Sequence, residues 1–231
     1  LPQSTPSVEG WDIDLRWRTA REVGGDFYDI FSTQENKLAF VIADVSDKGM
    51  PAALYMTVTR TLIRAAAQTL NSPAEILARV NDLLVGESQN GMFVTAIYAL
   101  LDPTTGELSY ANAGHNLPLL FRGESQEIEK LAKGEIALGV IEHVEYKNHA
   151  IQLNEKDTLL LYTDGLTEAF SSSGEQFSES RVIAALQENL YRSANELLES
   201  LENLINVFRK GEPPSDDLTM LAIHRLKNNS N

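Results

Sequence analysis

The sequence predicts an α+β fold, a layered sandwich in which two mainly antiparallel β-sheets stack with helices outside. Strand-like segments come first, two helical segments follow, and more strands precede a last helix and a last strand. This order lacks the strict alternation of strand and helix that a parallel, doubly wound sheet requires. A length of 231 residues, with 43% apolar residues, is ample for a packed core.

Periodicity and turn residues predict the individual elements. Residues 11–18 alternate apolar and polar side chains as a half-buried strand does, and residues 38–45 form the continuous apolar run of a fully buried strand. Between them, a glycine-broken bend leads into another strand. A helix is predicted from Gly49, with Pro51 in its first turn, and a second from Ser72 to about residue 87. Further strands are predicted over residues 93–101, 107–111, 117–121, 158–162 and 218–224, and a third helix over about 193–208.

Composition excludes several functions. The absence of cysteine excludes disulfides, thiolate metal sites and a mechanism through a cysteinyl phosphate. A net charge of −14 argues against nucleic acid as a partner, although bound cations would still let an acidic protein hold phosphate. Without a long apolar run or a signal-like start, we expect a soluble, cytoplasmic domain that makes no membrane contact itself.

The predicted layout is a linker over residues 1–10, one domain over 11–226 and a tail over 227–231. The chain has no initiator Met and begins with a linker-like segment, so we interpret it as part of a longer protein.

Acidic residues stand at the ends of the predicted strands: Asp26, Asp44, Asp164 and the pair Asp216 and Asp217. Converging carboxylates repel one another unless a cation neutralises them, and oxygen ligands favour Mg²⁺ or Mn²⁺. Any single aspartate at such a position is more often a turn residue that caps local backbone groups. The hypothesis of a metal site therefore depends on the whole set.

Five motifs occur in order along the chain: Val23-Gly-Gly-Asp-Phe-Tyr-Asp29, Asp44-Val-Ser-Asp-Lys-Gly-Met-Pro-Ala-Ala-Leu54, Asn112-Ala-Gly-His-Asn116, Tyr162-Thr-Asp-Gly-Leu-Thr-Glu168 and Asp216-Asp-Leu-Thr219. With them the sequence closely resembles the bacterial PP2C-like (PPM) serine/threonine phosphatases of the RsbU/SpoIIE type. The resemblance spans Trp11 to about Arg225. It implies a PP2C-like four-layer α/β/β/α sandwich that hydrolyses phosphoserine or phosphothreonine with a water activated by two Mn²⁺ or Mg²⁺ ions.

The resemblance also implies catalytic roles for three aspartates. Asp44 is expected to bridge both ions, and the backbone carbonyl of Val45 to bind one of them. Asp26 is expected to act through metal-bound water or as an additional direct ligand.

Asp164 is expected to bind the other ion together with Asp216. Asp217 could take the place of Asp216, and the sequence does not choose between them.

Two further residues have competing interpretations. Arg21 stands five residues before Asp26, where it could clamp a phosphate as a bidentate ligand, but an exposed arginine at a strand end is ordinary. His115 could protonate the leaving oxygen as a general acid. We favour the alternative that His115 orders its loop by hydrogen bonding.

The resemblance implies a phosphoprotein substrate, often a STAS-domain anti-anti-sigma factor, and an upstream sensor or regulatory domain that acts through the two helices after Asp44. It leaves a homodimer open. The rival functions are a catalytically silent module that binds a partner and a diguanylate cyclase suggested by residues 24–27. The cyclase leaves the later aspartate motifs unexplained, and the silent module should have lost metal ligands, whereas none is missing.

Overall fold

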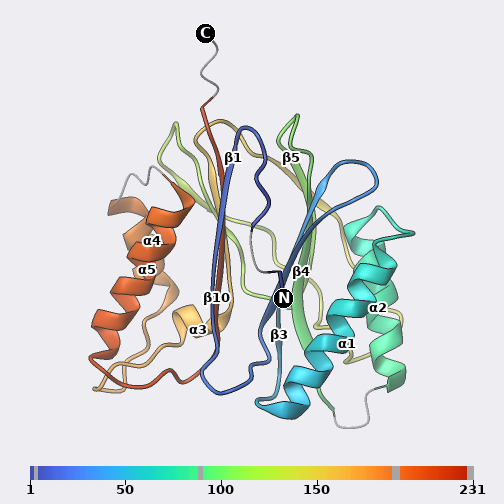
Figure 1. Cartoon of the computed structure of the whole chain (residues 1–231), viewed down its shortest axis with the longest axis horizontal. Coiled ribbons are helices and arrows are strands. Elements are labelled where there is room, and N and C mark those ends of the chain that lie inside the picture. The colour runs from blue at the N-terminus through green and yellow to red at the C-terminus, as the bar shows by residue number, and fades with distance from the viewer. Residues whose placement is uncertain (3–4, 88–90, 189–192, 228–231) are drawn as a thin grey trace. The chain divides into compact units, whose positions relative to one another are not determined.

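Figure 1 shows the computed structural model of the chain, which describes residues 1–2, 5–87, 91–188 and 193–227. Residues 228–231 of the predicted tail and residues 3–4 of the predicted linker lie outside this description. The chain forms two compact units. Unit 1 comprises Leu1–Ser4, Arg21–His115 and Ala132–Gln152, and unit 2 comprises Thr5–Ala20, Asn116–Leu131 and Leu153–Asn231. Each unit contains one five-stranded sheet whose paired strands run antiparallel, so the predicted α+β class is confirmed.

The sheet of unit 1 has the order β2-β3-β4-β5-β8. Its strands are β2 (Phe27–Ser32), β3 (Leu38–Val45), β4 (Val94–Leu101), β5 (Glu107–Ala113) and β8 (His149–Gln152), and its helices are α1 (Met50–Ala66) and α2 (Pro73–Glu87). Alternate residues of β3, among them Ala39, Val41 and Ala43, are buried in one apolar cluster with residues of both helices. Both helices therefore pack on the same face of this sheet (Figure 1).

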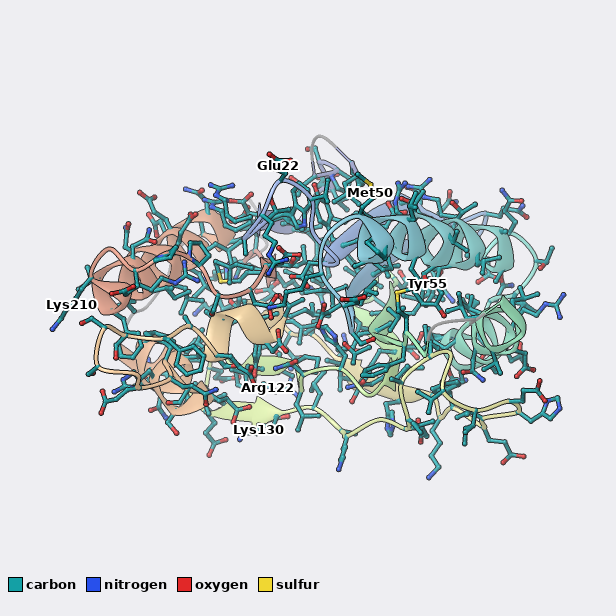
Figure 2. All side chains as sticks on the ribbon, turned by 90° about the horizontal axis from the view of Figure 1, so that it is seen from below. Glu22, Met50, Tyr55, Arg122, Lys130 and Lys210 are labelled. Atoms are coloured by element: carbon teal, nitrogen blue, oxygen red, sulfur yellow. The ribbon has the colours of Figure 1, made fainter. Side chains whose placement is uncertain are left out.

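Helix α1 follows Gly49, which has a φ of 82°, and carries a proline in its first turn, as the sequence predicts. Its buried residues are Ala52, Tyr55, Thr59, Ile63 and Ala66, which recur every three or four positions as the core face of a helix should. Met50 and Tyr55, labelled in Figure 2, represent the exposed and buried sides of α1, with exposed fractions of 61% and 9%.

The sheet of unit 2 has the order β1-β10-β9-β6-β7. Its strands are β1 (Trp11–Arg18), β10 (Leu218–Arg225), β9 (Thr158–Tyr162), β6 (Leu119–Phe121) and β7 (Ile128–Lys130), and its helices are α3 (Asp164–Thr167), α4 (Glu179–Glu188) and α5 (Ala194–Arg209). The first strand of the chain pairs with the last, with Trp11 opposite Arg225. Helix α5 begins at the N-cap Ser193, whose side chain accepts a hydrogen bond from the Glu196 N–H at 3.1 Å.

Most predicted elements are present, with small shifts of their ends. The strand predicted over 117–121 begins only at Leu119, after Pro118, which has no N–H to donate to a sheet. Helices α3 and α4 and strands β7 and β8 were not predicted. Helix α3 and strands β7 and β8 have only three or four residues each. Helix α4 is longer, and its buried residues Val182, Ala185 and Leu186 have helical spacing. Among the described residues, no helix is both long and apolar enough to cross a membrane.

Candidate functional site

In unit 1, two motif aspartates come to the same end of the sheet. Phe27 pairs with Ala43 across β2 and β3, so Asp26, just before β2, and Asp44, near the end of β3, lie at that shared end. Asp26 is 2% exposed. A Cβ at Gly25 would lie 3.2 Å from the backbone oxygen of Val45, which is closer than most side chains tolerate. The glycine therefore allows the backbone before Asp26 to approach the carbonyl predicted to bind metal.

His115 follows β5, and strand β4 lies between β5 and β3, the strand of Asp44. Thr95 of β4 is the register partner of Asp44, and its Oγ1 lies 2.8 Å from Nδ1 of His115. The backbone N–H of His115 donates to Oδ1 of Asn112 at 2.8 Å, and the Asn112 amide donates to the His115 carbonyl at 3.1 Å. These bonds order the loop after β5, which agrees with the interpretation we favoured for His115.

In unit 2, the remaining motif aspartates also share one end of their sheet. Asp164 lies two residues after the end of β9, as the first residue of α3, and Asp216 and Asp217 directly precede β10, the neighbouring strand. Two hydrogen bonds of 3.0 Å join these ends: the Thr163 N–H donates to the Thr219 carbonyl, and the Thr219 N–H donates to Oγ1 of Thr163. The pairing of β9 with β10 thus brings the aspartates of both motifs to the same end of this sheet.

The two adjacent aspartates differ in their surroundings. Asp217 is 7% exposed, and its Oδ1 accepts a hydrogen bond from the Ala20 N–H at 2.8 Å. Asp216 is partly exposed, and its Oδ1 accepts from the Asp217 N–H at 2.9 Å. Next to them, a Cβ at Gly165 would lie 1.7 Å from the Asp217 carbonyl oxygen, so only glycine fits there. Asp217 is therefore the more buried of the two, and its side chain closes the end of the β1–β10 pair through Ala20.

The donor set fits a hard divalent cation. Each unit presents carboxylates at one sheet end, and unit 1 adds the backbone carbonyl of Val45; all these donors are oxygen atoms, as Mg²⁺ and Mn²⁺ prefer. Among the described residues, no group of three or more acidic or histidine side chains lies closely enough together to hold an ion.

The sequence analysis assigned no role to Asp29, the second aspartate of the first motif. Asp29 is 1% exposed and is bound by two arginines of α1. An acidic residue within the otherwise apolar stretch 27–31 and two arginines four residues apart on one helix were the available signals. Arg21, by contrast, is exposed and lies in the bend before β2.

The fold agrees with that of solved PP2C domains. The SiaA-PP2C domain of Pseudomonas aeruginosa has a TM-score of 0.82 and 24% identity, over 93% of this chain and 86% of that one. The RsbU and RsbW domains of Rv1364c from Mycobacterium tuberculosis have a TM-score of 0.79 and 26% identity, over 96% of this chain and 61% of that one. The predicted PP2C-like fold is therefore confirmed.

The chain belongs to the SpoIIE family: the family's sequence profile, described as Stage II sporulation protein E (SpoIIE), matches residues 34–226. Protein IcfG of Synechocystis sp. is 29% identical over 97% of this chain. Phosphoserine phosphatase RsbU of Bacillus subtilis is 26% identical, also over 97%. The chain spans 39% of the length of IcfG and 66% of that of RsbU.

Proposed function

We propose that this chain is the catalytic domain of a metal-dependent protein phosphatase that hydrolyses phosphoserine or phosphothreonine. The observation that carries the proposal is that each sheet brings its motif aspartates to one end, Asp26 with Asp44 in unit 1 and Asp164 with Asp216 in unit 2. Membership of the SpoIIE family supports it, as does the name of RsbU, a phosphoserine phosphatase.

The motif aspartates would hold two Mn²⁺ or Mg²⁺ ions. Asp44 would bridge the ions with the Val45 carbonyl beside it, and Asp164 and Asp216 would complete the set. Such ions, when bound, activate a water molecule for attack and offset the charge on the phosphoryl oxygens. We assign this role to Asp216, which is partly exposed, rather than to Asp217, which is 7% exposed and bound to the Ala20 N–H.

The other motif residues would support this set. Asp26, buried just before β2, would act through metal-bound water or as an additional direct ligand. His115 holds its loop in place through Thr95 and Asn112. Arg21 stays a candidate for binding the substrate phosphate, because its exposed side chain is accessible.

For the substrate, we propose a phosphorylated serine on a small STAS-domain protein, as in the families that the motifs resemble, with an upstream regulatory domain in a longer cytoplasmic protein. RsbU and RsbP of Bacillus subtilis, both named phosphoserine phosphatases, support the choice of phosphoserine.

Hydrolysis of p-nitrophenyl phosphate and of a phosphoserine peptide, with Mn²⁺, Mg²⁺ or EDTA, tests the proposal. Turnover should require the metal and should be lost in Asp44→Asn and Asp164→Asn. Asp157→Asn is the control, because Asp157 is an aspartate of the same unit that lies at the opposite end of β9 from Asp164. A folded protein inactive with every metal, alone and in its full-length context, would instead indicate the catalytically silent binding module.

A further inference from the structure

A buried ion-pair cluster joins β2 to α1. Asp29 of β2 accepts hydrogen bonds on both carboxylate oxygens from Arg64, at 2.5 Å from Nε to Oδ2 and 2.8 Å from Nη2 to Oδ1. Arg60, one helical turn earlier, places its Nε 3.0 Å from Oδ2. The guanidinium of Arg64 also stacks on the ring of Phe31, 4.7 Å from its centroid. Two arginines on one face of α1 thus contact the same aspartate of β2.

The ion pairs of this cluster fix how α1 is placed on β2. A carboxylate that is 1% exposed is costly to bury unless it is paired, and Asp29 is paired twice. The bidentate contact with Arg64 fixes orientation as well as distance. The hydrogen bonds that Arg64 donates to Asp29 also raise the pKa of Arg64, so this arginine stays charged. The apolar core would hold α1 on the sheet without this cluster, but it would fix the position of the helix less strictly.

The cluster connects the two segments of unit 1 that carry its proposed metal ligands. Asp29 is the third residue of β2, and Asp26 directly precedes this strand. Helix α1 starts at Met50, only a few residues after Asp44 and Val45. A shift of α1 against β2 would therefore move Asp44 and Val45 relative to Asp26.

We propose that Asp29 is a positioning residue for metal binding. By holding Arg60 and Arg64, it fixes α1 against β2, and so it fixes the segment of Asp44 and Val45 relative to Asp26. This inference rests on the proposed function. Residues that orient metal ligands from behind typically change metal affinity by about 10–100-fold when they are replaced.

The chain contains a matched control for this proposal. Asp157 is 2% exposed, and it too is paired with an arginine, Arg122, whose Nη1 lies 2.8 Å from its Oδ2. It also accepts hydrogen bonds from backbone N–H groups of Gly123 and Asn154. Its position just before β9 is at the opposite end of the strand from Asp164. Asp157→Asn therefore disturbs a buried acid of the same kind away from the proposed ligands.

The experiment measures Mn²⁺ binding by isothermal titration calorimetry, alongside the Mn²⁺ dependence of p-nitrophenyl phosphate hydrolysis. For Asp29→Asn we expect Mn²⁺ to bind about tenfold more weakly or worse. Its KM for p-nitrophenyl phosphate should stay the same, and kcat should recover as Mn²⁺ approaches saturation. Arg64→Lys, which keeps the charge but loses the bidentate contact at a side chain that is 42% exposed, should weaken Mn²⁺ binding less and remain folded.

Three outcomes would overturn the proposal. Wild-type Mn²⁺ affinity in both Asp29→Asn and Arg64→Lys would show that the cluster does not position the ligands. Equal weakening by Asp157→Asn would show that any buried acid has the same effect. If the unsubstituted chain neither bound Mn²⁺ nor hydrolysed substrate, the proposed function itself would fail, and this inference with it.

Discussion

The carboxylate of Asp217 accepts a hydrogen bond from the backbone N–H of Ala20, with 2.8 Å between nitrogen and Oδ1. Ala20 lies just beyond the end of β1, and Asp217 lies just before β10, the strand paired with β1. One side chain thus closes the end of this strand pair. Its neighbour Asp216, to which we assign the metal-binding role, is partly exposed and accepts a hydrogen bond from the Asp217 N–H.

Substitution of each aspartate by alanine should separate these roles. Asp217→Ala leaves the Ala20 N–H without its acceptor, and it should lower the free energy of unfolding by about 1 kcal/mol in urea titrations. Asp216→Ala should unfold like the unsubstituted chain but lose metal-dependent turnover. Full turnover in Asp216→Ala, together with loss of turnover at normal stability in Asp217→Ala, would reverse the assignment.

Gly165→Ala should damage both stability and activity. Its Cβ would lie 1.7 Å from the Asp217 carbonyl oxygen, so the backbone beside Asp164 must move. We expect a loss of about 1–3 kcal/mol in the free energy of unfolding and weaker Mn²⁺-dependent turnover. Gly86→Ala, inside α2 with open space around the new Cβ, is the control and should be neutral or stabilising. Equal effects of both substitutions would contradict the steric argument.

Much of the fold could be predicted because its strands carry strong patterns. The run 38–45 and the alternation over 11–18 were each recognised with their observed bounds, as β3 and β1. The aspartates at strand ends could be found as a set for the same reason, since a strand end can be located from its apolar run.

The pairings of the polar residues could not be predicted, because they depend on tertiary contacts. The sequence shows Asp29 as one of two aspartates in a motif, and only the packing of α1 on β2 identifies it as the partner of Arg60 and Arg64. The choice between Asp216 and Asp217 likewise needed Ala20, almost two hundred positions away in the chain.

Arg209→Met should stabilise the protein. Arg209, at the end of α5, is 8% exposed, and among the described residues its Nε and Nη2 have no hydrogen-bond partner. Burial lowers the pKa of this arginine. Removing an uncompensated buried cation should raise the free energy of unfolding by about 1 kcal/mol or more in urea titrations.

Arg181→Met is the contrasting variant to Arg209→Met. The guanidinium of Arg181 donates to two backbone carbonyls and stacks on Phe208, so its loss should destabilise the protein. A loss of stability in Arg209→Met would contradict the prediction.

Stability should fall as the solution becomes mildly acidic. Burial lowers the pKa of His224, whose Nδ1 lies 2.8 Å from Oγ1 of Thr158, while the charges of Asp12 and Asp157 oppose this shift only in part. The unfolded chain therefore binds a proton at higher pH than the folded one. The stabilisation is complete above the unfolded value of about 6.5 and is lost as pH falls through the folded pKa.

Urea unfolding between about pH 7.5 and about pH 5 measures this dependence. His224→Gln should make stability less sensitive to pH over that range. His143→Gln, at a side chain that is 83% exposed, should leave the dependence as it is. An unchanged pH dependence in His224→Gln would refute the assignment to His224.

The pairing of β1 with β10 determines when unit 2 can be completed during synthesis. Among the described strands, β10 is the only neighbour of β1 in the sheet, so β1 cannot be paired until β10 has been synthesised. Strands β2 to β5, by contrast, pair in consecutive order and can assemble while the chain is still growing. The strands beside Asp26 and Asp44 can therefore form before the strand beside Asp216.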